Sequence, residues 1–333
     1  MQAQQRRQFG RTDIAISTVT MGCWAIVGDA TWGPQNESDA IAAIHAALAN
    51  GVNAFDSAEG YGAGYSEQIL AKALKGRRQD AVIASKVSPD HVNSCDDLLH
   101  SCEQSLKNLG TDYIDLYYLH WPNRTTPMVE ILRGFNKLRQ DGKIRCFGVS
   151  NFGRDDLCDL LAEGRCEVNQ LPYNLLWRVI ERDIVPICQQ HDIGITCYSP
   201  LAQGLLTGKF ASLADVPDGR ARTRHFSSQR PGTRHGEAGQ EAATTAALAE
   251  IRAIADDLSC PMGELALAWL IQQPGITSVI AGARNARQME ENARAMQRVL
   301  TTAVCARLNQ ATSALKDAFG HNPDMWQNPS RYR

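Results

Sequence analysis

Four polar side chains of the chain have the types and the positions needed to move a proton onto a carbonyl group. Asp56 ends the apolar run 53–56, Lys86 ends the run 81–86, and His120 ends the run 114–120, while Tyr61 follows Asp56 by five residues. A free phenol has a pKa of about 10, and a neighbouring ammonium group lowers that pKa while a carboxylate holds the ammonium in place. We therefore expect Asp56 and Lys86 to lower the pKa of Tyr61, which would protonate a carbonyl oriented by His120.

These side chains can meet only if the apolar runs end at one place. Eight such runs predict strands, over 19–22, 53–56, 81–86, 114–120, 145–150, 167–170, 193–199 and 278–282. Helical patterns separate them, over 38–50, 66–75, 94–109, 128–141, 154–163, 181–191, 241–258 and 262–272, with a further helix starting near 285. The alternation predicts an α/β fold of the (β/α)₈ TIM-barrel type, whose active site lies at the carboxyl ends of the strands.

Segments outside this alternation predict additions to the barrel. The first twenty residues, with a turn at 10–13, are typical of a β-hairpin. The stretch 202–240 is a long loop after the seventh strand, and the residues after the last strand form a helical tail. Ser66 has the residue type of a helix N-cap, and Asn50-Gly51 is a helix stop.

Length and composition exclude several classes of protein. The 333 residues are 44% hydrophobic and 21% charged with net charge −2, so we expect one soluble domain over 1–333 that binds neither nucleic acid nor a membrane. The ten cysteines show no zinc-site or disulfide spacing, which predicts a reduced, cytoplasmic protein without a metal. Arg6 and Arg7 precede no apolar segment and are expected to be ordinary surface residues. The oligomeric state stays open, and a homo-oligomer is compatible with the sequence.

Several motifs in one order make the chain resemble the aldo-keto reductases. FDSAEGYG (55–62), VIASK (82–86) and DLYYLHWP (115–122) carry that family's catalytic Asp, Tyr, Lys and His. GKIRCFGVSNF (142–152), VNQLPYNLL (168–176), YSPLAQGLLTGKF (198–210) and IAGARNARQMEEN (280–292) resemble its nicotinamide-cofactor segments. Ser57 departs from the family, which usually has Thr there.

The resemblance implies an NADP(H)-dependent oxidoreductase that reduces an aldehyde, ketone or sugar, or oxidises the alcohol, without a metal. It places Ser150, Asn151 and Gln170 at the nicotinamide carboxamide and Tyr198 under the ring. The other cofactor residues that it implies are Trp24, Ser199, Pro200, Leu201, Gln203, Gly204, Lys209, Gly282, Arg284, Gln288, Glu291 and Asn292. Arg284 opens a helix, where a 2′-phosphate is well placed, so NADPH is expected rather than NADH.

Aromatic and basic residues are candidates for contact with the substrate. Trp24, Trp32 and Trp121 follow predicted strands, and each could equally serve packing. The long loop carries Arg220, Arg222, Arg224 and Arg230, which could meet cofactor phosphates, an anionic substrate or only solvent. Trp326 in the tail is a further residue that could reach the pocket.

Two other functions fit parts of the pattern. Some proteins that resemble this family are cofactor-binding regulatory subunits of a membrane channel. A chain with that function would bind NADPH and turn over little substrate. A Schiff-base aldolase could use a lysine at a strand end, but Asp56 beside Lys86 would keep that lysine protonated. No dinucleotide-binding G-x-G-x-x-G follows a strand.

Overall fold

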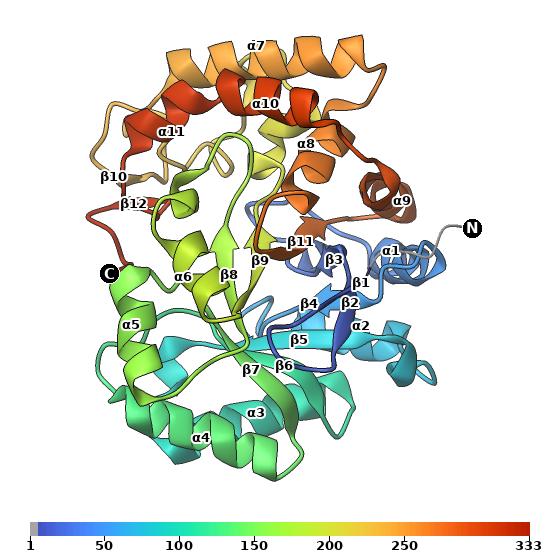
Figure 1. Cartoon of the computed structure of the whole chain (residues 1–333). Helices are drawn as coiled ribbons and strands as arrows, with labels where there is room; N and C mark the ends of the chain where they lie inside the picture. Colours follow the sequence, from blue (N-terminus) through green and yellow to red (C-terminus); the bar gives the residue numbers. More distant parts are fainter. Residues whose placement is uncertain (1–5) are drawn as a thin grey trace.

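A closed barrel of eight parallel strands forms the centre of the molecule in the computed structural model, which describes residues 6–333. The ring is complete because β11 pairs with both β3 and β9 (Figure 1). The strands are β3 (Val19–Gly22), β4 (Ala54–Asp56), β5 (Val82–Val87), β6 (Ile114–Leu119), β7 (Ile144–Ser150), β8 (Val168–Pro172), β9 (Gly194–Tyr198) and β11 (Ile276–Gly282). The predicted (β/α)₈ barrel is confirmed.

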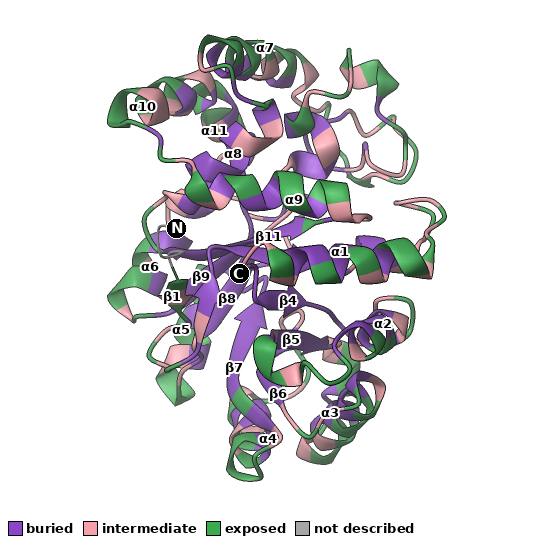
Figure 2. Cartoon of the chain, turned by 90° about the vertical axis from the view of Figure 1, so that its right-hand side faces the viewer, coloured by how far each residue is buried: buried purple, intermediate pink, exposed green. Residues whose placement is uncertain are grey.

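Helices surround the strands, and most of them have one buried and one exposed face (Figure 2). In α4 the buried residues recur at helical spacing, at Ile131, Phe135 and Leu138, while the remaining face is exposed. The helices are α1 (Glu37–Ala49), α2 (Tyr65–Ala73), α3 (Cys95–Leu109), α4 (Met128–Gln140), α5 (Arg154–Glu163), α6 (Ile184–Gln190), α7 (Glu241–Asp257), α8 (Met262–Ile271), α9 (Ala286–Arg294), α10 (Thr302–Ala311) and α11 (Ser313–Phe319). The last two form the predicted helical tail and pack on α7.

Of the two predicted helix ends, the stop of α1 is confirmed and the N-cap of α2 is wrong. Gly51 has a φ of +79° and follows Asn50 at the end of α1, as the sequence predicts. Ser66 is not the N-cap of α2, because the helix is entered through Gly64 at a φ of +88° and Ser66 lies within the first turn. The Ser66 hydroxyl donates instead to the carbonyl of Cys23 at 2.9 Å, which ties α2 to the loop after β3.

The predicted hairpin closes the amino-terminal end of the barrel; residues 1–5 of that prediction lie outside the described residues. β1 (Arg6–Gln8) pairs antiparallel with β2 (Ala15–Ser17), and Phe9 and Ile14 enter the apolar cluster inside the barrel. Arg7 is not an ordinary surface residue, because its guanidinium donates to the carbonyls of Ile271 and Ile276 at 2.8 and 2.6 Å. The hairpin therefore blocks this end, and the opposite end is left for a site.

The long loop and the tail meet at that opposite end. Two short strands, β10 (Arg234–His235) from the loop and β12 (Gln327–Asn328) from the tail, pair with each other. Asp324, fully buried, accepts hydrogen bonds from the backbone and side chain of Arg331 and so closes the tail on itself. The tail also reaches the barrel through Tyr332, which donates to Asn151 after β7. One domain over 1–333 stays a prediction.

The length of the helices and the state of the cysteines bear on two expectations from composition. Within residues 6–333, no helix is both long enough and apolar enough to cross a membrane. All ten cysteines have free thiols, and those in the predicted apolar runs, such as Cys146 and Cys197, are buried. The cytoplasmic location stays a prediction.

Candidate active site

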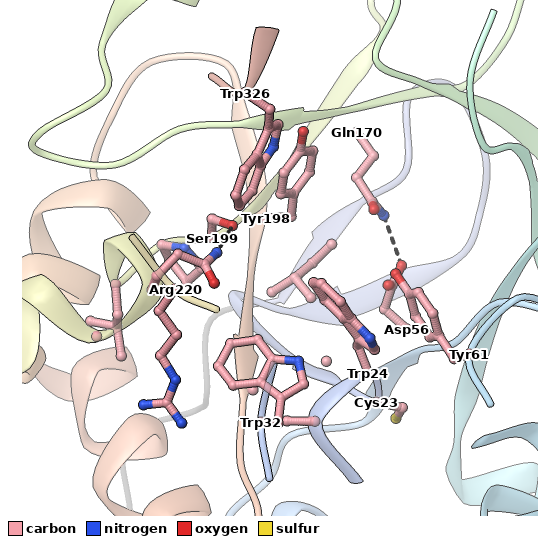
Figure 3. Close-up of a pocket in the computed structure, with 18 of the residues that line it drawn as sticks. Cys23, Trp24, Trp32, Asp56, Tyr61, Gln170, Tyr198, Ser199, Arg220 and Trp326 are labelled. Atoms are coloured by element: carbon pink, nitrogen blue, oxygen red, sulfur yellow. Dashed lines mark hydrogen bonds between the residues drawn. The ribbon is translucent and has the colours of Figure 1, made fainter. Parts of the chain in front are cut away.

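The carboxyl ends of the barrel strands open into a cavity of about 840 Å³. Asp56, His120, Ser150, Gln170 and Tyr198 line it from the ends of different strands. Figure 3 shows that Gln170, Asp56 and Tyr61 lie together at one side, with Tyr198 and Trp326 beside each other at another. The barrel thus brings together side chains that are far apart in the sequence, as the strand ends predict.

Lys86 is the buried hub of the predicted relay. Its ammonium group donates to the Asp56 carboxylate at 2.5 Å, to the carbonyl of Ser57 at 2.7 Å and to the Tyr61 hydroxyl at 3.3 Å. The side chain of Lys86 has no exposed surface. The other carboxylate oxygen of Asp56 accepts from the Gln170 amide at 2.7 Å (Figure 3). Since both ends of the ion pair are fixed by further hydrogen bonds, the charge on Lys86 is held beneath the phenol.

The electrostatics differ in one respect from the expected relay. The pKa of Tyr61 is raised, not lowered, because burial disfavours the phenolate more strongly than Lys86 favours it. Burial also opposes the charge on Lys86, but Asp56 and Tyr61 outweigh it and raise the pKa of that ammonium. At neutral pH Tyr61 therefore keeps its proton and Lys86 keeps its charge.

His120 faces the same phenol as a neutral imidazole. Its ring lies 6.0 Å from that of Tyr61, edge to face. Burial and the nearby positive charge of Lys86 lower the pKa of His120 to about 3. A neutral imidazole at this place can donate one hydrogen bond to a carbonyl oxygen, and it does not compete with Tyr61 as the proton source.

Three tryptophans predicted at the substrate site all line the cavity. Trp24 stacks on Tyr61 with ring centroids 6.0 Å apart and meets Trp32 edge-on at 5.5 Å. Trp121 is covered by the guanidinium of Arg331, 3.7 Å from its ring centroid. Trp326 lies beside Tyr198 (Figure 3). Several walls of the cavity are therefore aromatic, and Trp24 is the one of these tryptophans that stacks on the phenol.

The residues predicted at the carboxamide already have protein partners. Gln170 binds Asp56, and the Ser150 hydroxyl donates to the carbonyl of Gln170 at 3.1 Å. Asn151 donates to the carbonyl of His120, and its own oxygen accepts from the hydroxyls of Tyr198 at 2.8 Å and Tyr332 at 2.5 Å. A role at the carboxamide stays a prediction, while these bonds fix the orientation of Asn151 and the ring of Tyr198.

The segment from Ser199 to Gly204 forms a strained edge of the cavity. Ser199, Ala202 and Gln203 have φ values of +52°, +47° and +57°, which residues other than glycine rarely adopt. The amide nitrogen of Gln203 donates to the Ser199 hydroxyl, while its oxygen is buried and has no hydrogen-bond partner. Pro200 and Leu201 line the cavity with them. Strain and an unpaired acceptor in one cavity wall point to a ligand contact.

Basic residues continue the same edge towards the start of α9. Burial lowers the pKa of Lys209, and the charges of Arg220 and Arg284 lower it further. The guanidinium of Arg284 donates to Gln35 at 2.8 Å and to the carbonyls of Trp32 and Pro34, which ties α9 to the loop after β3. The remaining predicted cofactor residues here, Gly282, Gln288, Glu291 and Asn292, also line the cavity.

The arginines of the long loop divide into two pairs. Arg224 and Arg230 form ion pairs with Glu237 and Asp218, so they stabilise the loop. Arg220 and Arg222 line the cavity. The sequence patterns do not indicate several further residues at the cavity or touching its lining, among them Cys23, Arg234, Gln327, Arg331 and Tyr332. The tail residues lack a local signal, because their contacts depend on how the whole tail folds back.

Comparison with known proteins decides the family. A sequence profile described as "Aldo/keto reductase family" matches residues 18–313. The chain belongs to the aldo/keto reductase family. Asp56, Tyr61, Lys86 and His120 all lie within the residues that this profile matches.

Individual relatives of this aldo/keto reductase have names that describe different activities. The chain is 31% identical to an NADH-specific methylglyoxal reductase of Escherichia coli, over 92% of this chain and 98% of the other. It is 29% identical to a probable voltage-gated potassium channel subunit beta of Arabidopsis thaliana, over 92% and 96%. It superposes with a TM-score of 0.73 on the NADPH complex of an aldo-keto reductase from Klebsiella pneumoniae, at 29% identity over 92% and 95%.

Proposed function

We propose that this aldo/keto reductase reduces the carbonyl group of an aldehyde, ketone or sugar, or oxidises the alcohol, with Tyr61 as general acid and NADPH as cofactor. The observation that carries the proposal is the Tyr61 hydroxyl, 3.3 Å from a buried ammonium that is itself paired with a carboxylate. The methylglyoxal reductase among the relatives supports a carbonyl substrate. Small molecules are the proposed partners.

The residues move the proton as follows. The substrate carbonyl oxygen accepts hydrogen bonds from the Tyr61 hydroxyl and from the neutral ring of His120. As negative charge develops on that oxygen, the Tyr61 proton transfers to it, and the charge on Lys86 stabilises the phenolate that remains. Asp56 keeps Lys86 protonated and in place throughout. The raised pKa of Tyr61 keeps the proton available at neutral pH.

The cavity has the groups that NADPH requires. When bound, the reduced nicotinamide supplies the hydride. Tyr198 would stack on its ring, and the unpaired oxygen of Gln203 would accept a hydrogen bond from the cofactor. The segment from Ser199 to Gly204, with Lys209, would run along the pyrophosphate. Arg220 lies with Lys209 and Arg284 and would bind phosphate with them.

The choice of NADPH rests on Arg284 at the start of α9, where free backbone amides also favour an anion. The Klebsiella structure contains NADPH, whereas the related methylglyoxal reductase is NADH-specific. We therefore propose that Arg284, and not family membership alone, makes this protein prefer NADPH over NADH.

The second candidate is a regulatory subunit of a membrane channel, which the plant relative favours. The complete Asp56, Tyr61, Lys86 and His120 set favours turnover. Steady-state oxidation of NADPH by methylglyoxal, glyceraldehyde and aromatic aldehydes tests the two proposals. Turnover with at least one substrate is expected from an enzyme, whereas NADPH binding with no turnover on any of them would favour the subunit.

A further inference from the structure

Five basic residues line the cavity without an acidic partner among residues 6–333. They are Lys209, Arg220, Arg222, Arg234 and Arg284, and each lacks an ion pair within the described part of the chain. Arg331 also lines the cavity but is neutralised by Asp324 at 2.7 Å. Like charges gathered in one cavity repel each other, so a set of this size favours anionic ligands.

The five residues fall into two places. Lys209, Arg220 and Arg284 influence one another, since the charges of the two arginines lower the pKa of the lysine. They border the segment where the proposed function places the cofactor phosphates. Arg222 adjoins this group, because Arg220 and Arg222 both donate to Thr31, and with Arg234 it extends the basic residues onto the wall that β10 and the tail build.

Three contacts fix that second position. The Arg222 guanidinium lies 5.8 Å from the ring centroid of Trp326. The aliphatic part of Arg222 packs on Gly232, where a Cβ atom would come within 3.3 Å of its Cδ. Arg234 pairs in register with Gln327, the neighbour of Trp326. Since Trp326 lies beside Tyr198 (Figure 3), this wall adjoins the place of the reacting ring.

The guanidinium of Arg222 has fewer hydrogen-bond acceptors around it than it has N–H donors. One terminal nitrogen donates weakly to the Thr31 hydroxyl at 3.4 Å, while Nε is buried and has no partner. An unpaired buried donor carries a desolvation cost that a ligand acceptor would remove. The edge formed by Nε and a terminal nitrogen matches the two oxygens of a carboxylate or phosphate.

We propose that Arg222 and Arg234 bind an anionic group, a carboxylate or a phosphate, on the part of the substrate away from its reacting carbonyl. This inference rests on the proposed reductase function, and it specifies that the substrate carries a negative charge. Carbonyl compounds with such a group are preferred over neutral compounds of the same size. The aromatic wall of Trp121 and Trp326 suits an unsaturated or ring-shaped body between the two ends.

A matched set of aldehydes tests the inference. 4-Carboxybenzaldehyde and 4-formylphenyl phosphate carry the anion, and 4-formylbenzamide is the neutral equivalent of the first. We expect the kcat/KM of the wild type with NADPH to be at least about tenfold higher for one of the anions than for the amide, and the preferred anion distinguishes carboxylate from phosphate. This preference decreases with added salt, because exposed charges are screened.

Variants assign the preference to the two arginines. The double variant Arg222→Met with Arg234→Met reduces the anionic aldehyde no faster than the amide, while its kcat/KM for the amide and its affinity for NADPH stay within about threefold of the wild type. Arg230→Met is the matched control in the same loop, since Arg230 is paired with Asp218, and it keeps the preference. Equal reduction of anion and amide by the wild type, or loss of NADPH affinity in the double variant, would overturn the inference.

Failure of the proposed function is distinguishable from failure of the inference. If the wild type binds NADPH and reduces none of the aldehydes, the proposed reaction is wrong. Calorimetry then tests the site without turnover, with 4-hydroxymethylbenzoate and 4-hydroxymethylbenzamide added to the NADP⁺ complex. The inference predicts that the benzoate binds at least about tenfold more tightly and that the double variant removes the difference; equal affinities would contradict it.

Discussion

Replacing Asp56 by Asn should show how strongly the buried Lys86 depends on its partner. In the wild type the ammonium has no exposed surface and has the Asp56 carboxylate at 2.5 Å. Breaking a buried pair by removing one charge costs about 3–5 kcal/mol, because the other charge is left uncompensated. We expect Asp56→Asn to lower the free energy of unfolding by that amount near neutral pH, measured by urea denaturation.

The pH dependence identifies the cause of this loss. In the wild type the raised pKa of Lys86 gives stability that is complete below the unfolded pKa of about 10.5 and is lost as the pH rises through the folded pKa. Without the carboxylate, only Tyr61 opposes the effect of burial, so we expect the pKa of Lys86 to fall below its unfolded value and the unfolded state to bind the extra proton. The cost of Asp56→Asn should therefore shrink as the pH approaches about 10.

Gln170→Leu is the matched control. It removes the hydrogen bond of 2.7 Å to the same carboxylate but leaves the charge of Asp56 in place. Loss of that bond should cost about 1–3 kcal/mol, with little change between neutral and alkaline pH. The reasoning is refuted if Asp56→Asn unfolds within about 1 kcal/mol of the wild type at neutral pH, or if its cost does not depend on pH.

Three further predictions concern the cofactor, the tail and pH. Arg284→Met should weaken NADPH binding by about 10–100-fold and NADH binding by less than about threefold in fluorescence titrations, because only NADPH has the 2′-phosphate. The control is Arg287→Met in the first turn of α9, an exposed arginine paired with Glu291, which should leave the difference between the cofactors unchanged; equal losses for both cofactors in Arg284→Met would contradict the assignment. Tyr332→Phe should lower the free energy of urea unfolding by about 0.5–1.5 kcal/mol, since Asn151 keeps its bond from Tyr198; a loss above about 3 kcal/mol would show that the hydroxyl supports the tail in another way. Burial lowers the pKa of His225 to about 4, so on acidification the unfolded state takes up the proton first. The free energy of unfolding should therefore fall by up to roughly 3 kcal/mol between about pH 6.5 and 4. His225→Gln should reduce this pH dependence in urea denaturation at a series of pH values, whereas an unchanged pH dependence would exclude His225 as its source.

The barrel and the relay could be predicted because their signals are local. Strands buried on both faces are continuous apolar runs, so an Asp, Lys or His at the end of such a run stands out. The closure of the barrel then places Asp56, Lys86 and His120 at one mouth. No side-chain geometry had to be known for that step.

The pKa of Tyr61 and the contacts of the tail could not be predicted in this way. Whether burial or Lys86 dominates depends on the walls around the phenol, which Trp24 and His120 complete. Tyr332 reaches Asn151 across 181 positions of the chain. The four loop arginines have the same residue type, and only the folded loop gives Arg224 and Arg230 acidic partners and leaves Arg220 and Arg222 in the cavity.

The role of Tyr61 as the proton donor is tested by Tyr61→Phe in one paired measurement. The change removes the hydroxyl and keeps the ring that stacks on Trp24. NADPH affinity and kcat for the best aldehyde are measured on the same preparation. We predict affinity within about twofold of the wild type and a kcat lower by about 10²–10⁴-fold, the usual contribution of a positioned acid. A kcat within about threefold of the wild type would contradict the assignment of Tyr61 as the acid.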